Sequence, residues 1–151
     1  MGLDAQAAVD QVLDRVRDLE LADMLEANRL ILDTLGASCE GELVDSQLDG
    51  RVVVGSGARL ERSTVRGPAI IAPGVQLIDA YVGPYTAIGD DCVVEASEVE
   101  NSILLAGCEV RHLDGRLESS LLGRNARIGR DDRQPRAYRF MLGDNSEVKV
   151  P

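Results

Sequence analysis

The sequence is poor in aromatic residues, with one Phe, three Tyr and no Trp among 151 residues. Modules that bind unpaired bases stack them on aromatic side chains, so this class of function is disfavoured. A formal net charge of −10 points the same way, because an acidic surface repels the phosphate backbone. We therefore expect no nucleic-acid partner.

Long hydrophobic runs and metal-ligand clusters are also lacking. No stretch approaches the roughly 18 consecutive apolar residues of a membrane span, and the N-terminus does not resemble a secretory signal. We expect no membrane partner and a cytoplasmic location. Cys39, Cys92 and Cys108 form no Cys-x-x-Cys pair and have one histidine beside them, a poor donor set for zinc. Buried free thiols are expected, without a metal or a cofactor.

What the sequence does contain is a rhythm of aliphatic residues spaced six, six and five positions apart. The members of this series are Leu48, Val54, Leu60, Val65, Ile71, Leu77, Val82, Ile88, Val94 and Val99. Gly, Pro, Asp and Asn fill the positions between them. Neither a helix nor plain β-alternation has this period, which is typical of hexapeptide repeats. We predict a mainly β fold, a left-handed parallel β-helix of about five coils over residues 37–133, with N-terminal α-helices.

The repeat loosens after Val99. Leu104 and Leu105 compete for one inward position, and an extruded loop near 112–115 would explain the interruption. Such a loop is of interest because acyltransferases built on hexapeptide coils often carry a catalytic histidine on one.

Residues 1–36 are predicted to be an amphipathic helical segment, either one helix or a helix pair. Two apolar stripes recur at helical spacing, one over 9–19 and one over 21–35, and Gly36 is a plausible C-cap. A stacked coil has two raw edges that would recruit other chains. We expect the helices to cover one edge and the tail 134–151 to pack on the other or on a neighbouring subunit.

Several stretches resemble the C-terminal domain of long-form glucose-1-phosphate thymidylyltransferases. They are 66–71 (Arg-Gly-Pro-Ala-Ile-Ile), 83–90 (Gly-Pro-Tyr-Thr-Ala-Ile-Gly-Asp), 120–128 and the tail motif 135–145 (Pro-Arg-Ala-Tyr-Arg-Phe-Met-Leu-Gly-Asp-Asn). The helical stretch 25–33 is similar to the connector that leads into that domain. The resemblance covers about residues 22–149 and implies a β-helix. The family's Gly-rich nucleotide loop has no counterpart before Leu48, so we expect no nucleotidyl-transfer activity.

Arginines recur at every third residue from Arg124 to Arg139. One interpretation is an anion site in which Arg124, Arg127 and Arg136 hold a phosphate or carboxylate of a small-molecule ligand. The alternative, which we favour, is pairing with the protein's own acids, across a subunit interface or onto the acidic helices, because residues 1–50 carry a net charge of −9 and residues 116–151 carry +3.

Candidate catalytic residues are His112, Tyr85 and Asp79. His112 is the only histidine, and imidazole is the side chain most often used as a general acid or base in enzymes. Tyr81 and Tyr85 flank a Gly-Pro pair and, with Asp79, offer phenol and carboxylate groups that could line a ligand cleft. A surface role for His112 and a packing role for Tyr85 are the simpler interpretations. Tyr138 is expected to anchor the tail or to contact a ligand.

Two classes of function follow from these features. The first is a small-molecule-binding and oligomerisation module that forms a homo-oligomer, either a trimer or a dimer. The second is an enzyme recruited to new chemistry in a specialised-metabolite pathway, as a cyclase, isomerase or acyltransferase. Its ligand would occupy a cleft between helices and coil or between subunits. The sequence leaves open whether the protein is an enzyme.

Overall fold

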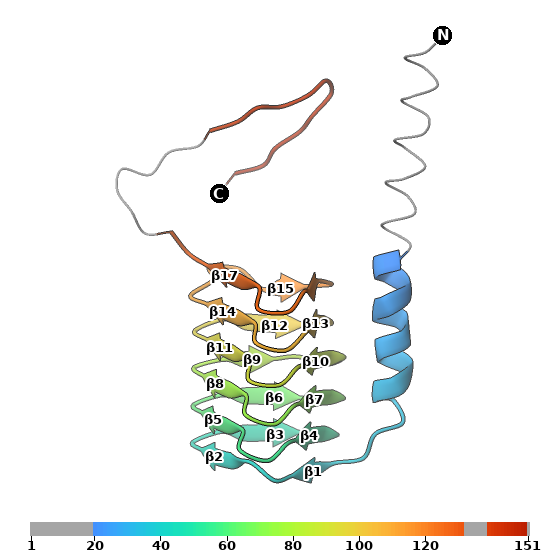
Figure 1. Cartoon of the computed structure of the whole chain (residues 1–151), viewed down its shortest axis with the longest axis vertical. Coiled ribbons are helices and arrows are strands. Elements are labelled where there is room, and N and C mark those ends of the chain that lie inside the picture. The colour runs from blue at the N-terminus through green and yellow to red at the C-terminus, as the bar shows by residue number, and fades with distance from the viewer. Residues whose placement is uncertain (1–19, 132–138, 151) are drawn as a thin grey trace.

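The computed structural model describes residues 20–131 and 139–150. They form one helix at 20–32 and a stack of short parallel strands, β1 to β17 (Figure 1). The predictions for residues 1–19, and those for Arg136 and Tyr138, lie outside the described residues.

The strands form three parallel sheets that make the sides of a triangular coil. Sheet A contains β1 (Ser38–Cys39), β4 (Val52–Val54), β7 (Ala69–Ile71), β10 (Thr86–Ile88), β13 (Ile103–Leu104) and β16 (Leu121–Leu122). Sheet B contains β2 (Glu42–Val44), β5 (Arg59–Glu61), β8 (Gln76–Ile78), β11 (Val93–Glu95), β14 (Glu109–Arg111) and β17 (Arg127–Gly129). Sheet C contains β3 (Gln47–Asp49), β6 (Thr64–Arg66), β9 (Tyr81–Val82), β12 (Glu98–Glu100) and β15 (Leu117–Glu118).

Each strand pairs with the strand one turn away, so like residues stack on one another. Leu60 lies in register with Leu77, and Val65 with Val82. With six strands in each of sheets A and B and five in sheet C, the described coil completes more than five turns. The prediction of a mainly β fold, a stacked parallel β-helix of about five coils, is confirmed.

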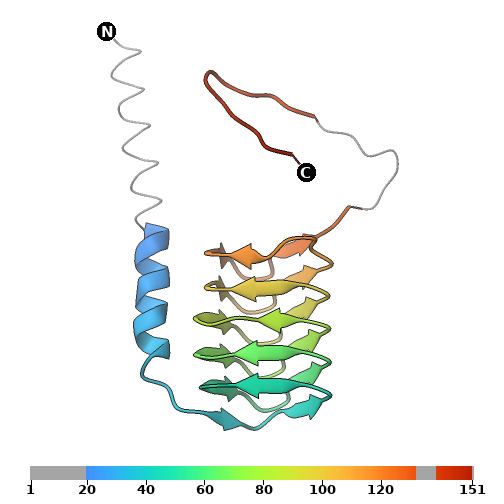
Figure 2. The ribbon, with the colours of Figure 1, turned by 180° about the vertical axis from the view of Figure 1, so that it is seen from behind.

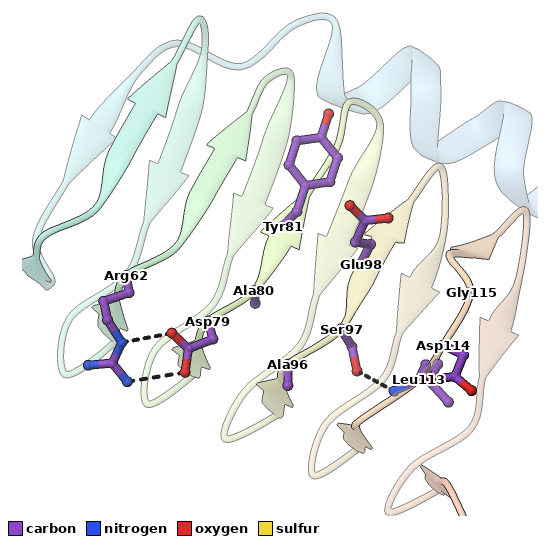
Figure 3. A pocket seen from close by; sticks show the side chains of 10 residues that line it. All are labelled: Arg62, Asp79, Ala80, Tyr81, Ala96, Ser97, Glu98, Leu113, Asp114 and Gly115. Carbon is purple, nitrogen blue, oxygen red and sulfur yellow. Dashed lines mark hydrogen bonds and ion pairs between the residues drawn. The ribbon is translucent and has the colours of Figure 1, made fainter.

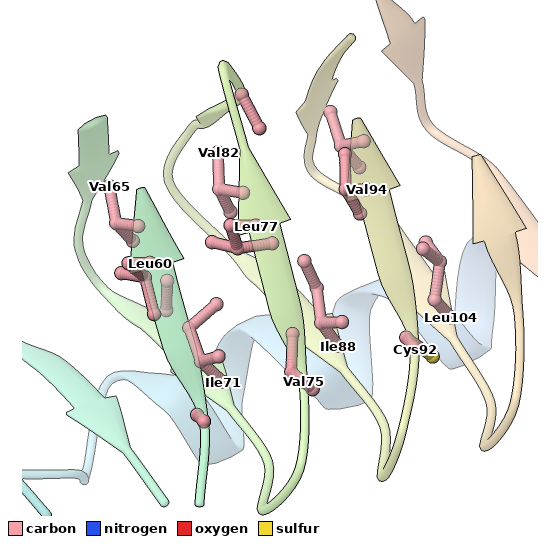
Figure 4. Close-up of a cluster of buried hydrophobic side chains, with 14 of the residues drawn as sticks. Leu60, Val65, Ile71, Val75, Leu77, Val82, Ile88, Cys92, Val94 and Leu104 are labelled. Carbon is pink, nitrogen blue, oxygen red and sulfur yellow. The ribbon is translucent and has the colours of Figure 1, made fainter. Parts of the chain in front are cut away.

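The predicted inward residues fill the core of the coil (Figure 4). From Val54 to Val99 every member of the aliphatic series is at most 1% exposed, and Leu48 packs against the core from the end of the stack. Cys92 and Cys108 are buried free thiols as predicted, but Cys39 is exposed. Cys39 lies on β1, the first strand of sheet A, where no earlier turn covers it.

The corners of the triangle explain the turn residues of the repeat. At the corner between sheets B and C, one residue per turn has a left-handed backbone: Asp45, Arg62, Asp79, Ala96 and His112. At the corner between sheets A and B the same conformation occurs at Gly57, Gly74, Asp91, Gly107 and Asn125. Gly, Asn and Asp tolerate positive φ better than other residues, and they occupy all five of these positions at the corner between sheets A and B but only two of the five at the corner between sheets B and C.

The interruption after Val99 has two structural sources. First, the turn from Ala87 to Ile103 is one residue short, which places Leu104 inward at 1% exposure and leaves Leu105 outside at 40%. Second, five residues separate β14 from β15, where only two separate β11 from β12. The corner that follows His112 is therefore longer than those below it, as the sequence indicated.

The helix lies beside the stack and parallel to its long axis, as both views show (Figures 1 and 2). Our expectation that it covers an edge of the coil was wrong for its described part. Leu25 and Leu32 are buried at 8% and 1% exposure, so the helix covers the side of several turns. The helix ends at residue 32, four residues before Gly36, which is therefore not its C-cap.

The described tail, residues 139–150, is exposed throughout. Its large apolar side chains include Met141 at 101% and Leu142 at 53% exposure. Among the residues that the structure describes, no helix is long and apolar enough to cross a membrane.

Candidate functional site

The outer face of sheet A is apolar along most of the stack. From β4 to β16 each strand turns one aliphatic side chain away from the core, and the strand register aligns these residues. They are Val53, Ile70, Ala87, Ile103 and Leu121, hereafter the apolar ladder. Strands of a parallel coil alternate inward and outward residues, so this ladder is not part of the core.

The outer faces of sheets B and C are charged instead. On sheet B, Arg59 forms ion pairs with Glu42 at 3.3 Å and with Glu61 at 2.6 Å. On sheet C, Arg66 lies 3.8 Å from Asp49 on the neighbouring turn. Exposed pairs of this kind add little stability each, but they make these two faces compatible with water.

A groove separates the helix from the later turns of the apolar ladder. It encloses about 370 Å³ and is lined by Met24, Ala27, Asn28, Ile31, Ile103, Leu105 and Leu121, hereafter the helix groove. Several of these apolar side chains are exposed, with Met24 at 51%, Ile31 at 61% and Leu105 at 40%. The groove is thus an unfilled apolar surface with a single polar side chain, that of Asn28, in its wall.

A second hollow of about 360 Å³ continues the helix groove across sheet A and shares Ile103 and Leu105 with it. Asp90 and Arg124 are the charged residues in its lining. Within the described ranges, Arg124 forms no ion pair. Of the two predicted ligand-binding arginines that the structure describes, Arg124 and Arg127, it is Arg124 that lies beside an open apolar surface.

Tyr85 holds the helix against the coil. Its hydroxyl donates a hydrogen bond to the Asp33 carboxylate at 2.9 Å, and the Arg29 guanidinium lies 4.0 Å from its ring centroid. Asn28 donates to the Tyr85 carbonyl at 3.1 Å. The hydrogen bond to Asp33 and burial together raise the pKa of Tyr85. These contacts make Tyr85 an anchor for the helix that forms one wall of the groove.

Two further residues of the corner between sheets C and A contact the same helix. The Arg51 guanidinium donates to the carbonyls of Asp33 and Leu35 at the end of the helix. Arg29 reaches Asn101 one turn beyond Tyr85, at 3.5 Å. The helix is therefore tied to three levels of one corner, which fixes its distance from the apolar ladder.

A polar pocket of about 440 Å³ lies along the opposite corner, between sheets B and C (Figure 3). It brings together two of the predicted site residues, Asp79 and Tyr81. Arg62 donates to both carboxylate oxygens of Asp79, at 2.7 and 3.2 Å, and this contact lowers the pKa of Asp79. In Figure 3 the Tyr81 ring points away from that pair.

Other polar groups of this pocket are also engaged by protein partners. The Ser97 hydroxyl donates to the Glu95 carbonyl and accepts from the Leu113 amide. Arg116 lies 5.1 Å from the Tyr81 ring centroid and 3.5 Å from Glu98. The charged groups of this pocket therefore already have protein partners, and the Tyr81 hydroxyl is a polar group of its lining without a hydrogen bond among the described residues.

His112 occupies the same corner as Asp79, but two turns away. Ala96 lies between them in the column of left-handed residues, so their backbones are roughly 10 Å apart. The imidazole is exposed, and its Nε2 lies 3.9 Å from Glu95 Oε1. Tyr85 is on a different corner. The structure therefore does not gather His112, Tyr85 and Asp79 into one site.

The described arginines of the regular series pair mainly with acids of the coil. Arg127 lies 3.5 Å from Glu109, and Arg130 donates to Asp114 at 2.7 Å. Both arginines therefore pair with the protein's own acids, the alternative we favoured, but these acids lie on the neighbouring turn of the coil and not on the acidic helix. Arg127 and Arg130 thus each form an ion pair with an acid one turn away.

Reasoning from the sequence missed the apolar ladder and the helix groove. A signal for the ladder was present, because Val53 and Ile70 each precede an inward residue in the series. Two adjacent aliphatic residues in a strand mean that one of them points outward. The sequence analysis applied this rule only to Leu104 and Leu105.

Three curated relatives match most of this chain. It is 44% identical over 131 residues to the glucose-1-phosphate thymidylyltransferase of Streptomyces antibioticus, covering 86% of this chain and 36% of that protein. The enzyme of the same name from Streptomyces griseus is 44% identical over 132 residues, covering 86% and 37%. A low-salt glycan biosynthesis nucleotidyltransferase of Haloferax volcanii is 37% identical over 132 residues, covering 85% and 37%.

The predicted resemblance to glucose-1-phosphate thymidylyltransferases is thereby confirmed for part of their length. The chain spans about a third of the curated relatives it matches. No protein-family model matches it. Among the described residues, no group of three or more His, Cys, Asp or Glu side chains is placed to hold a metal ion.

Proposed function

We propose that this chain is a binding and assembly module, related to part of the glucose-1-phosphate thymidylyltransferases, that self-associates through the outer face of sheet A. The observation that carries the proposal is the apolar ladder. One side of the coil carries outward aliphatic side chains on five turns, four of them half-buried and Leu121 exposed, while the other two sides carry ion pairs.

The energetic argument concerns the area that an assembly would remove from water. Burial of apolar surface is worth about 25 cal/mol per Å², and monomeric proteins rarely keep a large contiguous apolar patch exposed. The apolar ladder and the helix groove, which includes the exposed Met24 and Ile31, form one such surface. Identical chains are the simplest partner, because most soluble oligomers are closed and symmetric. A dimer and a trimer both satisfy this argument.

The remaining features of the proposal are consistent with a module that does not itself transfer nucleotides. The charged groups of the pocket between sheets B and C are paired within the protein, and His112 and Asp79 are two turns apart. We place the module in the cytoplasm. Its relatives are named as nucleotidyltransferases, so a partner or small-molecule ligand from sugar-nucleotide metabolism is the natural one to test.

The test is a charge placed on one face at a time. Ile103→Arg puts an unpaired cation in the middle of the apolar ladder, whereas Val93→Arg puts the same cation on the outer face of sheet B. Sedimentation velocity should show an oligomer for the unsubstituted chain and for Val93→Arg. The Ile103→Arg variant should be a monomer, or associate at least tenfold more weakly, because the cation would be buried without a partner. A monomeric unsubstituted chain would contradict the proposal.

A second function has one observation in its favour. The helix groove is a cleft between helix and coil, with apolar walls and a volume of about 370 Å³, within the range of small-molecule sites. An enzyme recruited to cyclisation, isomerisation or acyl transfer in a specialised-metabolite pathway would bind its substrate there.

A thermal-shift screen separates the two functions. The panel holds thymidine nucleotides, sugar phosphates, dTDP-sugars, acyl-CoAs and apolar polyketide-like compounds. A ligand at 100 times its dissociation constant adds about 2.7 kcal/mol. A shift caused by an apolar compound and abolished by Ile31→Asp would favour the recruited enzyme. A shift caused only by dTDP-sugars would favour a regulatory binding module.

A further inference from the structure

The described part of the tail carries apolar side chains that the chain itself leaves uncovered. Met141 is 101% exposed and Leu142 is 53% exposed, and Val148 and Val150 are about half exposed. The contacts of this segment include two local ones, from Ser146 to the Gly143 carbonyl and from Lys149 to Glu147. Large apolar groups held in water favour an arrangement that buries them.

The residues that the structure describes also leave the helix groove uncovered. Met24 and Ile31 on one wall and Leu105 and Leu121 on the other are between 36% and 61% exposed. The groove is bounded on two sides only, by the helix and by sheet A. Sites for small molecules typically bury about 70–90% of the ligand, so a small molecule in this open groove would need a further cover. An extended peptide segment is the better match, because it fills the groove and supplies its own cover.

Charge also favours the tail as the occupant. Arg139 precedes the apolar residues 140–142, and the acids Glu20 and Asp23 precede Met24 at the start of the described helix. All three charged residues are exposed. A tail whose apolar residues enter the groove near Met24 would bring its cation close to these acids, and opposite charges attract.

We propose that residues 139–142 of one copy of this chain seat in the helix groove of a second copy. This inference rests on the proposed function, self-association through sheet A, and names the element that the partner contributes. A second copy is the occupant because the single chain leaves both the tail and the groove exposed. Reciprocal exchange in a closed assembly covers every tail and every groove at once.

Cysteine cross-linking between two differently tagged full-length chains tests the exchange. Both chains carry Cys39→Ser to remove the exposed native thiol. One chain also carries Leu121→Cys in the groove, and the other carries Met141→Cys in the tail. Oxidation after the two are mixed should give a disulfide-linked heterodimer. The matched control replaces Leu121→Cys by Ile78→Cys on the outer face of sheet B, and should give none.

A single chain with both Leu121→Cys and Met141→Cys decides which copy supplies the tail. Dilution before oxidation should reduce the cross-link, because it forms between chains. A cross-link that persists within one chain at any dilution would overturn the exchange, since the tail would then fill its own groove.

Substitutions in the full chain separate this inference from the proposed function. Met141→Asp should weaken self-association at least tenfold, whereas Val148→Asp, which lies beyond the seated segment, should leave it unchanged. If Ile103→Arg abolishes association while Met141→Asp does not and no heterodimer cross-link forms, the tail exchange is overturned and assembly through sheet A stands. If the unsubstituted chain is monomeric, both are overturned.

Discussion

The outer face of sheet A and the outer faces of sheets B and C rest on the same kind of interior but present opposite chemistry. All three sheets turn small aliphatic residues inward at close to zero exposure, as Leu60, Val65 and Ile71 do. Outside, sheet A carries the apolar ladder and sheets B and C carry ion pairs. The interior therefore specifies the coil, and the exterior specifies what the coil contacts.

The two sides of one strand make this division testable. In β7, Ile71 is 0% exposed in the core and its neighbour Ile70 belongs to the apolar ladder. We expect Ile71→Ala to lower the free energy of unfolding by about 2–5 kcal/mol, because it opens a cavity in a stacked core. Ile70→Ala should cost about 1 kcal/mol or less in the monomer. Urea unfolding of both variants measures the difference.

If Ile70→Ala lowered the free energy of unfolding as much as Ile71→Ala, the distinction between interior and exterior would be wrong. To exclude a contribution from assembly, unfolding should be repeated at several protein concentrations. A concentration dependence that disappears in Ile70→Ala, with little change in the monomer, would sharpen the comparison further.

A second prediction concerns a polar residue within the interior of sheet A. Thr86 is fully buried, and its hydroxyl oxygen has no hydrogen-bond partner among the described residues. Its neighbours in register are Ala69 and, one turn further, Val52. We expect Thr86→Val to raise the free energy of unfolding by about 1 kcal/mol, because it removes an unpaired buried polar group. Loss of stability in Thr86→Val would show that the hydroxyl has an unseen partner.

The interior was predictable from the sequence because its rule is strict. An inward side chain must fit the same narrow space on every turn, so aliphatic residues recur with the six, six, five rhythm from Val54 to Val99. Corners require a left-handed residue on most turns, which accounts for the Gly, Asn and Asp between them. The prediction became ambiguous at Leu104 because the turn before it is one residue short.

The exterior was not predictable to the same degree. Outward positions have no fixed size or polarity, so Ile70 and Glu95 are equally compatible with the coil. The place of the helix depends on a few contacts between distant residues, such as Tyr85 with Asp33. No periodicity encodes such contacts. For that reason Tyr85 was expected at a catalytic site or in packing, and its link to the helix was not foreseen.

The third prediction tests whether the Tyr85 hydroxyl helps to hold the helix beside sheet A. Tyr85→Phe removes the hydrogen bond to Asp33 but keeps the ring under Arg29. We expect a few-fold faster hydrogen exchange in residues 20–32 at neutral pH, with exchange in the core strands unchanged. Unchanged exchange in the helix would show that Leu25 and Leu32 alone hold it.

The pKa of Tyr85 gives the same contact a pH dependence. Its pKa is raised above the ordinary value of 10.0 by the hydrogen bond to Asp33 and by burial, so the folded state favours the neutral phenol. The contact is fully present below the ordinary pKa and is lost as pH rises through the raised value. Ultraviolet titration of tyrosine should show a high-pH component in the unsubstituted chain that is missing in Tyr85→Phe.

The smallest effect on stability is expected for the ion pair between Asp79 and Arg62, at the corner between sheets B and C. Asp79→Asn keeps a side chain that tolerates the left-handed backbone at this corner, where φ is 50°. It removes the charge that accepts two hydrogen bonds from Arg62. Because the pair is exposed, we expect only a slight decrease in stability at neutral pH, which about 1 M salt should remove.

The stability that this pair contributes depends on pH, because the pKa of Asp79 is lowered by its contact with Arg62. The pair contributes above the ordinary carboxyl pKa, and its contribution is lost as pH falls through the lower folded-state value. Thermal unfolding of Asp79→Asn and of the unsubstituted chain should therefore converge in strong acid. A loss for Asp79→Asn as large as that for Ile71→Ala would mean that the ion pairs of the outer faces hold the coil together. In that case the outer faces of sheets B and C would stabilise the fold, and being free for a partner would no longer be what distinguishes the apolar ladder of sheet A.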